Sequence, residues 1–142
     1  MAVDLVAERE EVWAASVDEK PGALASVLST LADAGADLDF VILRRAPERP
    51  GTGVVFVTPL QGDREVETAC EVGFCVTSKL HSVRVEGPNE PGLVARLCGV
   101  VGDAGIGLRG MSAAVLGNRC VVHFGVDSAE DERTVIRLMS EL

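Results

Sequence analysis

Apolar residues in the first half of the chain follow two spacings, one of every second position and one of every third or fourth. Stretches with the first spacing predict half-buried strands, and stretches with the second predict amphipathic helices. The order β-α-β-β-α-β is typical of the ferredoxin-like arrangement, in which two helices cover one face of an antiparallel sheet. The predicted elements are strand 11–17, helix 21–34, strand 38–43, strand 54–60, helix 62–72 and strand 74–77.

The second half of the chain repeats the first at an offset of 70 positions. Pro21 and Gly22 return as Pro91 and Gly92, and the stretch ADAGADL returns as GDAGIGL. This repeat predicts an α+β chain of two ferredoxin-like βαββαβ units with antiparallel sheets and helices on one face. The repeated elements are strand 80–86, helix 91–104, strand 108–116, strand 120–126 and helix 129–141, which assigns residues 8–77 and residues 78–142 to the two units.

The second half ends without a fourth strand. Before the first unit lies a short extra segment in which Val3 and Leu5 alternate with polar or small residues. In this topology the fourth strand lies beside the first, at a position that otherwise exposes unpaired backbone. We therefore expect Ala2–Ala7 to supply the last strand of the second unit. The alternative is a frayed N-terminal tail.

Charge and composition narrow the classes of function. The formal net charge is −9 and the sequence pI is near 4.6, so binding to nucleic acid, which depends on neutralising phosphates, is not expected. No apolar run approaches the roughly 18 residues of a membrane span. The acidic start MAVDLVAEREE carries no secretory signal. A cytoplasmic protein without membrane contact is predicted.

Few residues have a pattern that predicts metal or catalytic chemistry. The four cysteines show no CxxC or other paired ligand spacing, and Cys98 and Cys120 fall in apolar segments, so reduced and buried thiols are expected. His81 and His123 lie on predicted strands without partner spacing. The two arginines at residues 44–45 are interpreted as the solvated end of a strand. No metal site, cofactor or catalytic group is predicted.

Two copies of one turn carry a family resemblance. The segments DEKPGAL, residues 18–24, and NEPGLV, residues 89–94, each follow a strand and open a helix that ends in Ala-Gly. Together they resemble the ACT domain, a small regulatory module of amino-acid metabolism, over nearly the whole chain. The resemblance implies a non-catalytic protein that binds small effectors, most often amino acids, where two such domains meet. It also implies that the turn and the helix start line the pocket.

The chemistry of an amino acid fits such a turn. A helix N-terminus offers unpaired N–H groups and a favourable dipole to a carboxylate, and acidic or amide side chains can accept from the ammonium. The family usually places Asp or Asn two residues before the proline, as at Asn89, whereas the first unit has Glu19 there beside Asp18. The predicted ligand-binding residues are Asp18, Glu19, Lys20, Gly22, Ala23, Leu24, Asn89, Glu90, Gly92, Leu93 and Val94.

Structural roles are the alternative for these residues. Asp18 and Asn89 could serve only to cap turns, and Gly22 and Gly92 could serve only to let a helix pack closely on the sheet. Gly22 and Gly92 would otherwise let backbone approach the ligand closely.

The predicted function is that of a tandem ACT-like regulatory protein that binds an amino acid between turn 18–24 and turn 89–94, or between their symmetry mates. The effector would change assembly or contact with another protein, such as a regulated enzyme. A homodimer is expected because small units expose strand edges. One alternative is a ligand-free dimerisation or protein-interaction module. A less favoured one is a metal sensor that uses His81, His123 and the cysteines.

Overall fold

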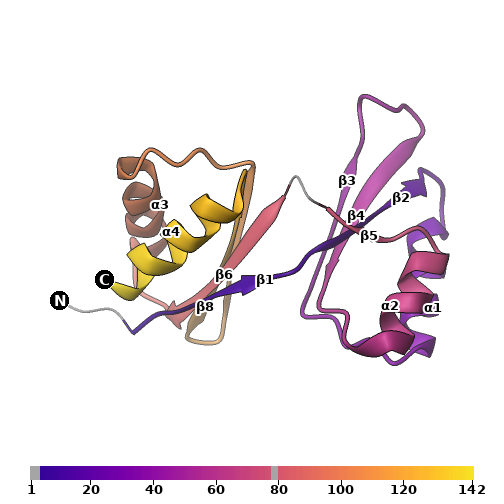
Figure 1. The fold of residues 1–142 in the computed structure, drawn as a ribbon, viewed down its shortest axis with the longest axis horizontal. Coiled ribbons are helices and arrows are strands. Elements are labelled where there is room, and N and C mark those ends of the chain that lie inside the picture. The colour runs from indigo at the N-terminus through magenta and orange to yellow at the C-terminus, as the bar shows by residue number, and fades with distance from the viewer. Residues whose placement is uncertain (1–3, 78–79) are drawn as a thin grey trace. The chain divides into compact units, whose positions relative to one another are not determined.

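A computed structural model describes residues 4–77 and 80–142. The chain forms two compact units (Figure 1), which we call the first unit, residues 11–77, and the second unit, residues 4–10 together with 80–142. Each unit contains a four-stranded antiparallel sheet and two helices. The structure therefore confirms the α+β class with two βαββαβ units.

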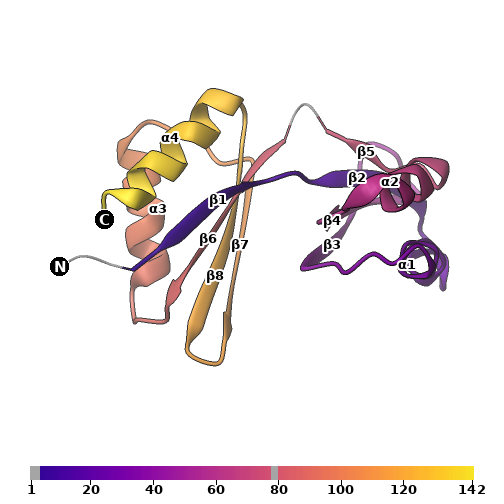
Figure 2. The same cartoon turned by 60° about the horizontal axis from the view of Figure 1, so that its bottom comes forward.

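The first unit has a sheet of order β3-β4-β2-β5, in which all neighbours are antiparallel. Both helices lie on one face of this sheet (Figure 2). The elements are β2 (Trp13–Asp18), α1 (Ala23–Asp33), β3 (Phe40–Arg45), β4 (Thr52–Thr58), α2 (Gly62–Glu71) and β5 (Cys75–Val76).

The core of the first unit follows the predicted alternation. Side chains at every second position of β2 and β4 meet residues of both helices and the residue before β5. The prediction of buried thiols is wrong for Cys70 on α2, which is exposed, while its neighbour Ala69 is fully buried. Successive helical residues are about 100° apart around the axis, so only one of the two can face the sheet. The buried cluster is Trp13, Ala15, Val17, Leu31, Val55, Val57, Leu60, Ala69 and Phe74.

The second unit has a sheet of order β1-β6-β8-β7. Its helices α3 and α4 also lie together on one face of the sheet (Figure 1). Its core is separate from that of the first unit and contains Phe124, Leu97 and Met139 at its centre. The elements are β1 (Val6–Glu10), β6 (His81–Pro88), α3 (Leu93–Asp103), β7 (Gly110–Leu116), β8 (Arg119–Val126) and α4 (Ala129–Ser140).

The N-terminal strand β1 pairs with the first strand of the second unit. Its register with β6 runs from Val6 opposite Glu86 to Glu10 opposite Ser82. The strand differs in extent from the expected Ala2–Ala7, since it begins at Val6, continues through Glu10, and leaves residues 2 and 3 outside the described residues. Residues 8–10, which the sequence grouped with the first unit, thus lie in the second.

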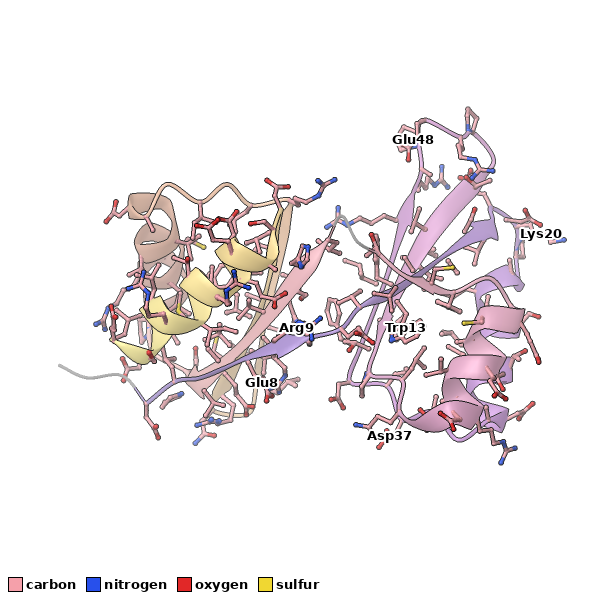
Figure 3. All side chains as sticks on the ribbon, in the orientation of Figure 1. Glu8, Arg9, Trp13, Lys20, Asp37 and Glu48 are labelled. Atoms are coloured by element: carbon pink, nitrogen blue, oxygen red, sulfur yellow. The ribbon has the colours of Figure 1, made fainter. Side chains whose placement is uncertain are left out.

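Polar contacts explain why β1 continues past its last apolar residue. Arg9 Nε lies 3.0 Å from Glu132 Oε1 on α4, and His81 Nδ1 lies 3.5 Å from the other oxygen of this buried carboxylate. On the other side of β1, Ser82 Oγ donates to Glu10 Oε1 at 2.8 Å, and His123 Nδ1 lies 2.5 Å from the same oxygen. Figure 3 shows the side chains of Glu8 and Arg9 on opposite sides of the strand. Side chains of β6, β8 and α4 therefore fix Arg9 and Glu10 in β1, although the alternation of apolar residues does not predict a strand at these polar positions.

Candidate functional site

The two Pro-Gly turns have the same backbone geometry. Gly22 is the N-cap of α1 with φ of 87°, and Gly92 is the N-cap of α3 with φ of 83°. Each helix therefore begins one residue after the glycine, at Ala23 or Leu93, and not at the proline as predicted. A glycine in the left-handed region cannot continue a right-handed helix, so it sets the first helical residue after itself.

Glycine is needed at positions 22 and 92 because of the positive φ angle, and not because a side chain would clash with its surroundings. A Cβ atom built on Gly22 or Gly92 meets no heavy atom within 4 Å. Close packing of the helix on the sheet, the structural alternative for these glycines, is therefore wrong. Any other residue at either position would adopt a left-handed conformation at a cost of about 1 kcal/mol.

In α1 and α3, the two helices that start at a Pro-Gly turn, no side chain of the helix caps the N-terminus or neutralises its positive dipole end. No side chain caps α1 or α3, and neither first turn contains an acidic residue. The other two helices differ. The first turn of α2 contains Asp63 and Glu65, and that of α4 contains three acidic residues and a Ser128 cap. The free ends of α1 and α3 are therefore suited to an anion.

Two cavities flank the turn between β2 and α1. One has a volume of about 330 Å³ and lies toward β3 and β4, and the other, of about 430 Å³, lies toward the end of α2. Asp18 and Lys20 line both cavities, Glu19 and Leu24 line the first, and Gly22 and Ala23 line the second. The six residues predicted in this turn thus all lie in cavity walls.

Most of the rest of the first cavity's wall comes from the β3–β4 hairpin, whose residues were not among the predicted ligand-binding residues. Leu43, Arg44, Arg45 and Gly53 line it. A Cβ atom on Gly53 would lie 2.9 Å from the carbonyl oxygen of Arg44, so glycine keeps this wall in place. The arginines at 44–45, interpreted as a solvated strand end, are exposed but also border the cavity. In the sequence, only the two adjacent positive charges at the end of this predicted strand could have indicated a role in the site.

Ion pairs and one backbone hydrogen bond fix the first turn. Arg45 Nε lies 2.8 Å from Glu19 Oε1, and Lys20 Nζ lies 3.9 Å from Asp18 Oδ2. The Glu19 N–H donates to the carbonyl of Gly51 at 2.9 Å. The turn is therefore held against the hairpin at one side of the cavity, while the Asp18 side chain is 73% exposed and available to a ligand.

The second turn shares this backbone arrangement but not the charges. The Asn89 N–H donates to the carbonyl of Asn118 in the β7–β8 hairpin at 2.8 Å. Asn89, Glu90 and Gly92 are exposed, Val94 is half-buried, and Leu93 is buried in the core. Gly53 and Cys120 are counterparts in the two units, because each lies opposite the equivalent residue of the first strand, Val17 or Gly87. Arg45 lies opposite Gly53 and Val115 lies opposite Cys120, so Val115 takes the place of Arg45 in the second unit.

The N-terminal segment covers the sheet beside the second turn. Gly87, the counterpart of Val17, would place a Cβ atom 2.5 Å from Leu5 Cδ2 and 3.3 Å from the Asp4 carbonyl oxygen. Leu5 therefore occupies the space that a side chain at position 87 would need. In the first unit the corresponding neighbour is β5, which is only two residues long, and there the 430 Å³ cavity is open beside Val17. The two turns thus differ in accessibility.

The histidines and cysteines, considered as metal ligands or catalytic groups, do not form a site in the described residues. Within residues 4–77 and 80–142, no group of three or more His, Cys, Asp or Glu side chains could hold a metal ion. His81 and His123 contact the carboxylates that join β1 to its unit. Cys120 is buried and Cys98 is half-buried, whereas Cys75 is exposed like Cys70. In the described part of the chain, every helix is too short or too polar to cross a membrane.

Glu86 on β6 lies between two arginines. Arg84 Nη1 lies 2.9 Å from one oxygen and Arg119 Nε lies 3.3 Å from the other. The hydrogen bond from Arg84 and then that from Arg119 hold the pKa of the Glu86 carboxyl below its ordinary value of 4.5. Because this pKa is lowered only in the folded protein, Glu86 adds stability above pH 4.5 that is lost as pH falls through the lower folded pKa.

We expect Glu86→Gln to make stability less dependent on pH below pH 4.5, since the amide does not titrate. Urea unfolding on both sides of that pH measures the effect. Glu8→Gln is the matched control, because Glu8 lies on the neighbouring strand, 3.9 Å from Arg84. An unchanged acid dependence in Glu86→Gln would contradict the assignment.

No protein-family model and no curated protein matches the sequence. Solved structures match its fold over nearly the whole chain. Protein BT0572 from Bacteroides thetaiotaomicron has a TM-score of 0.76 at 19% identity, with 95% of this chain and 89% of that chain covered. The ligand-free regulatory subunit of aspartate kinase from Thermus thermophilus has a TM-score of 0.66 at 19% identity, with 99% and 98% covered.

A third similar structure contains bound amino acids. Aspartokinase III of E. coli in complex with lysine and aspartate has a TM-score of 0.56 at 16% identity, and the match covers 97% of this chain and 32% of that chain. The chain therefore has the fold of aspartate kinase regulatory subunits, which is a tandem of ACT-type units. The resemblance read from the two Pro-Gly turns is confirmed at the level of the fold.

Proposed function

We propose that this chain is a non-catalytic regulatory protein that binds an amino acid at the turn between β2 and α1. The observation that carries the proposal is the N-terminus of α1, which has no side-chain cap and no acidic first turn and lies beside two cavities. The shared fold with kinase regulatory subunits supports a regulatory role without supplying the ligand.

The groups around the turn match the parts of an amino acid. The N–H groups in the first turn of α1 after Ala23, whose own N–H donates to the carbonyl of Lys20, would donate to the carboxylate. The exposed carboxylate of Asp18 would accept hydrogen bonds from the ammonium. Leu24 and Leu43 line the first cavity and would contact the carbon chain of the ligand. Glu19 is paired with Arg45 at 2.8 Å, whereas Asp18 is 73% exposed and lies 3.9 Å from Lys20, so Asp18 is the stronger candidate for the ammonium.

The second turn is a weaker candidate. Asn89, Glu90, Gly92, Leu93 and Val94 provide the same uncapped helix start. Leu5 covers Gly87 beside this turn, however, and Leu93 is part of the core. We therefore assign the effector to the first turn.

Regulation would act through assembly or through a protein partner, such as a regulated enzyme, in the cytoplasm. The edge strands β3 and β7 expose Val41, Leu43, Met111, Val115 and Leu116. Exposed apolar edge strands favour pairing with another chain, which supports a homodimer. The mass in solution tests this part of the proposal, and a value of 14.9 kDa, that of one chain, would contradict it.

Thermal unfolding against the twenty amino acids tests the proposed site. A ligand at 100 times its dissociation constant stabilises the folded state by about 2.7 kcal/mol, which raises the unfolding midpoint by several degrees. We expect a selective shift in the natural protein and its loss in Asp18→Asn. The Asp18 side chain is 73% exposed, so this substitution should leave the fold intact.

Asp37→Asn provides the matched control. Asp37 is exposed, and it lies at the opposite end of the first unit from Lys20 (Figure 3). It should keep the full ligand-induced shift. If no amino acid shifts the midpoint of the natural protein, the ligand-free interaction module becomes the better account, and the uncharged edge strand β7 is the surface at which to seek its partner.

A further inference from the structure

We propose that the ligand of the first turn carries a second negative group, as an acidic amino acid does, and that Arg45 binds this group. The inference rests on the proposed function and adds the chemical class of the ligand. It comes from the lining of the first cavity, in which Arg45 at the end of β3 occurs together with Leu24 of the first turn of α1 and with Leu43.

Arg45 is the group of the cavity wall that is available to a second anionic group. The whole chain carries a formal charge of −9, yet Lys20 and Arg45 line the first cavity together with Asp18 and Glu19. Arg44 also borders it, but it alternates with Arg45 along β3, so its side chain leaves the sheet on the other face. The carboxylate and the ammonium of a neutral amino acid would be matched by the helix start and by Asp18, and a second carboxylate on the ligand would match the guanidinium of Arg45.

Arg45 is placed on the correct side of the sheet for this role. It lies opposite Gly53, and Gly53 belongs to the same alternating set as the core residues Val55 and Val57, which face the helices. The side chain of Arg45 therefore leaves the sheet on the helix-covered side, where the cavity is.

The contact with Glu19 orients Arg45 without using all of its donors. The contact is made by Nε of Arg45, which lies 2.8 Å from Glu19 Oε1. A guanidinium has five N–H donors arranged in a planar fork, so its terminal nitrogens can bind a further carboxylate. The Arg45 side chain is 84% exposed, which leaves it accessible to a ligand that enters the cavity.

The second unit lacks the basic residues of this arrangement. The positions of Arg44 and Arg45 are taken by Ala114 and Val115, and the position of Lys20 is taken by Glu90. The same backbone turn therefore has no group for a second carboxylate. The inference applies to the first unit alone.

Calorimetric titration with pairs of isosteric ligands tests the inference. L-aspartate is compared with L-asparagine, and L-glutamate with L-glutamine, at constant pH and ionic strength. A hydrogen bond between two charged groups is stronger than one that involves a neutral amide. We expect one acidic ligand to bind at least about tenfold more tightly than its amide, a ratio that corresponds to about 1.4 kcal/mol.

Arg45→Gln should reduce that ratio to near one. Arg49→Gln is the control, because Arg49 is an exposed residue of the same hairpin that does not line the cavity, and it removes the same charge. The control should keep the preference for the acidic ligand. Circular dichroism of each variant establishes that the fold is retained.

Other outcomes separate this inference from the proposed function. Amides or L-lysine that bind as tightly as the acids, with binding lost in Asp18→Asn, would overturn the acidic ligand and leave the amino-acid site in place. Succinate that binds as tightly as aspartate would keep the requirement for two carboxylates and remove that for an ammonium. A ratio unchanged in Arg45→Gln would overturn the role of Arg45. If none of these compounds bound while another of the twenty amino acids shifted the unfolding midpoint, the acidic ligand alone would be overturned. If no amino acid bound in either experiment, both the inference and the proposed function would fail.

Discussion

Deletion of residues 1–10 should unfold the second unit while the first unit stays folded. The deletion removes β1, so the outer edge of β6 loses its backbone partner along the whole register from Glu86 to Ser82. It also removes Arg9 from the buried carboxylate of Glu132. The Arg9 side chain is 61% exposed, so this contact contributes less than a fully buried ion pair does. The larger loss is the backbone pairing of β6 together with the packing of Leu5 and Ala7 on the core, in a unit for which an ordinary stability is about 5–15 kcal/mol.

Hydrogen exchange measures this result for each unit separately. Amides of residues 80–142 should exchange fast in the deleted protein, while those of 11–77 should stay protected. Two point variants of adjacent residues refine the comparison. Arg9→Gln should lower the stability of the second unit, and Glu8→Gln should change it little, because the Glu8 side chain is 62% exposed. Full protection of β6 without residues 1–10 would show that β1 is not needed for folding.

Truncation of Phe74 should have a comparable effect on the first unit. Phe74 is fully buried among residues from both helices and from β2 and β4. Replacing a buried Phe by Ala removes apolar burial and leaves a cavity, which together cost about 3–5 kcal/mol. We therefore expect Phe74→Ala to unfold residues 11–77 at a markedly lower urea concentration than in the natural protein.

Phe56→Ala is the matched control for Phe74→Ala. Phe56 lies on β4 of the same unit but is only partly buried, and it alternates with the core residues Val55 and Val57. Its truncation should cost less free energy of unfolding. An equal loss in the two variants would show that the helix-covered face does not dominate the stability of the first unit.

Both predictions test whether the two units are stabilised independently, one by perturbing the second unit and the other by perturbing the first. Each unit has its own buried cluster, but the chain does not pass through the units one after the other. It builds β1 of the second unit, then the complete first unit, and then the rest of the second. The stability of the second unit should therefore depend on a segment that the first unit separates from it in sequence.

The candidate site also combines residues that are adjacent in the sequence with residues that are distant in it. The turn residues 18–24 were predicted from a motif, and their backbone conformation depends on Pro21 and Gly22 themselves. Arg45 and Gly53 reach the same cavity only because β3 and β4 pair in one register. Sequence patterns identify a hairpin but do not fix which of its side chains face a turn elsewhere in the chain.

The difference between the two turns also depends on tertiary structure. In sequence they are two copies of one motif, and the helix starts have nearly the same geometry. The contact of Leu5 with the space beside Gly87, and the short length of β5 beside the first turn, make their surroundings unequal. Neither feature lies within the repeated motif, so the motif alone predicts two equivalent sites.

The sequence by itself determined the repeat, the order of helices and strands, and the glycines that end α1 and α3, Gly35 and Gly105, whose φ angles are positive as the capping pattern predicts. These features follow from the spacing of apolar residues and from local backbone preference. The extent of β1 was decided by tertiary structure. Its last residue, Glu10, contacts His123, 113 positions away, and such contacts depend on packing that no local pattern encodes.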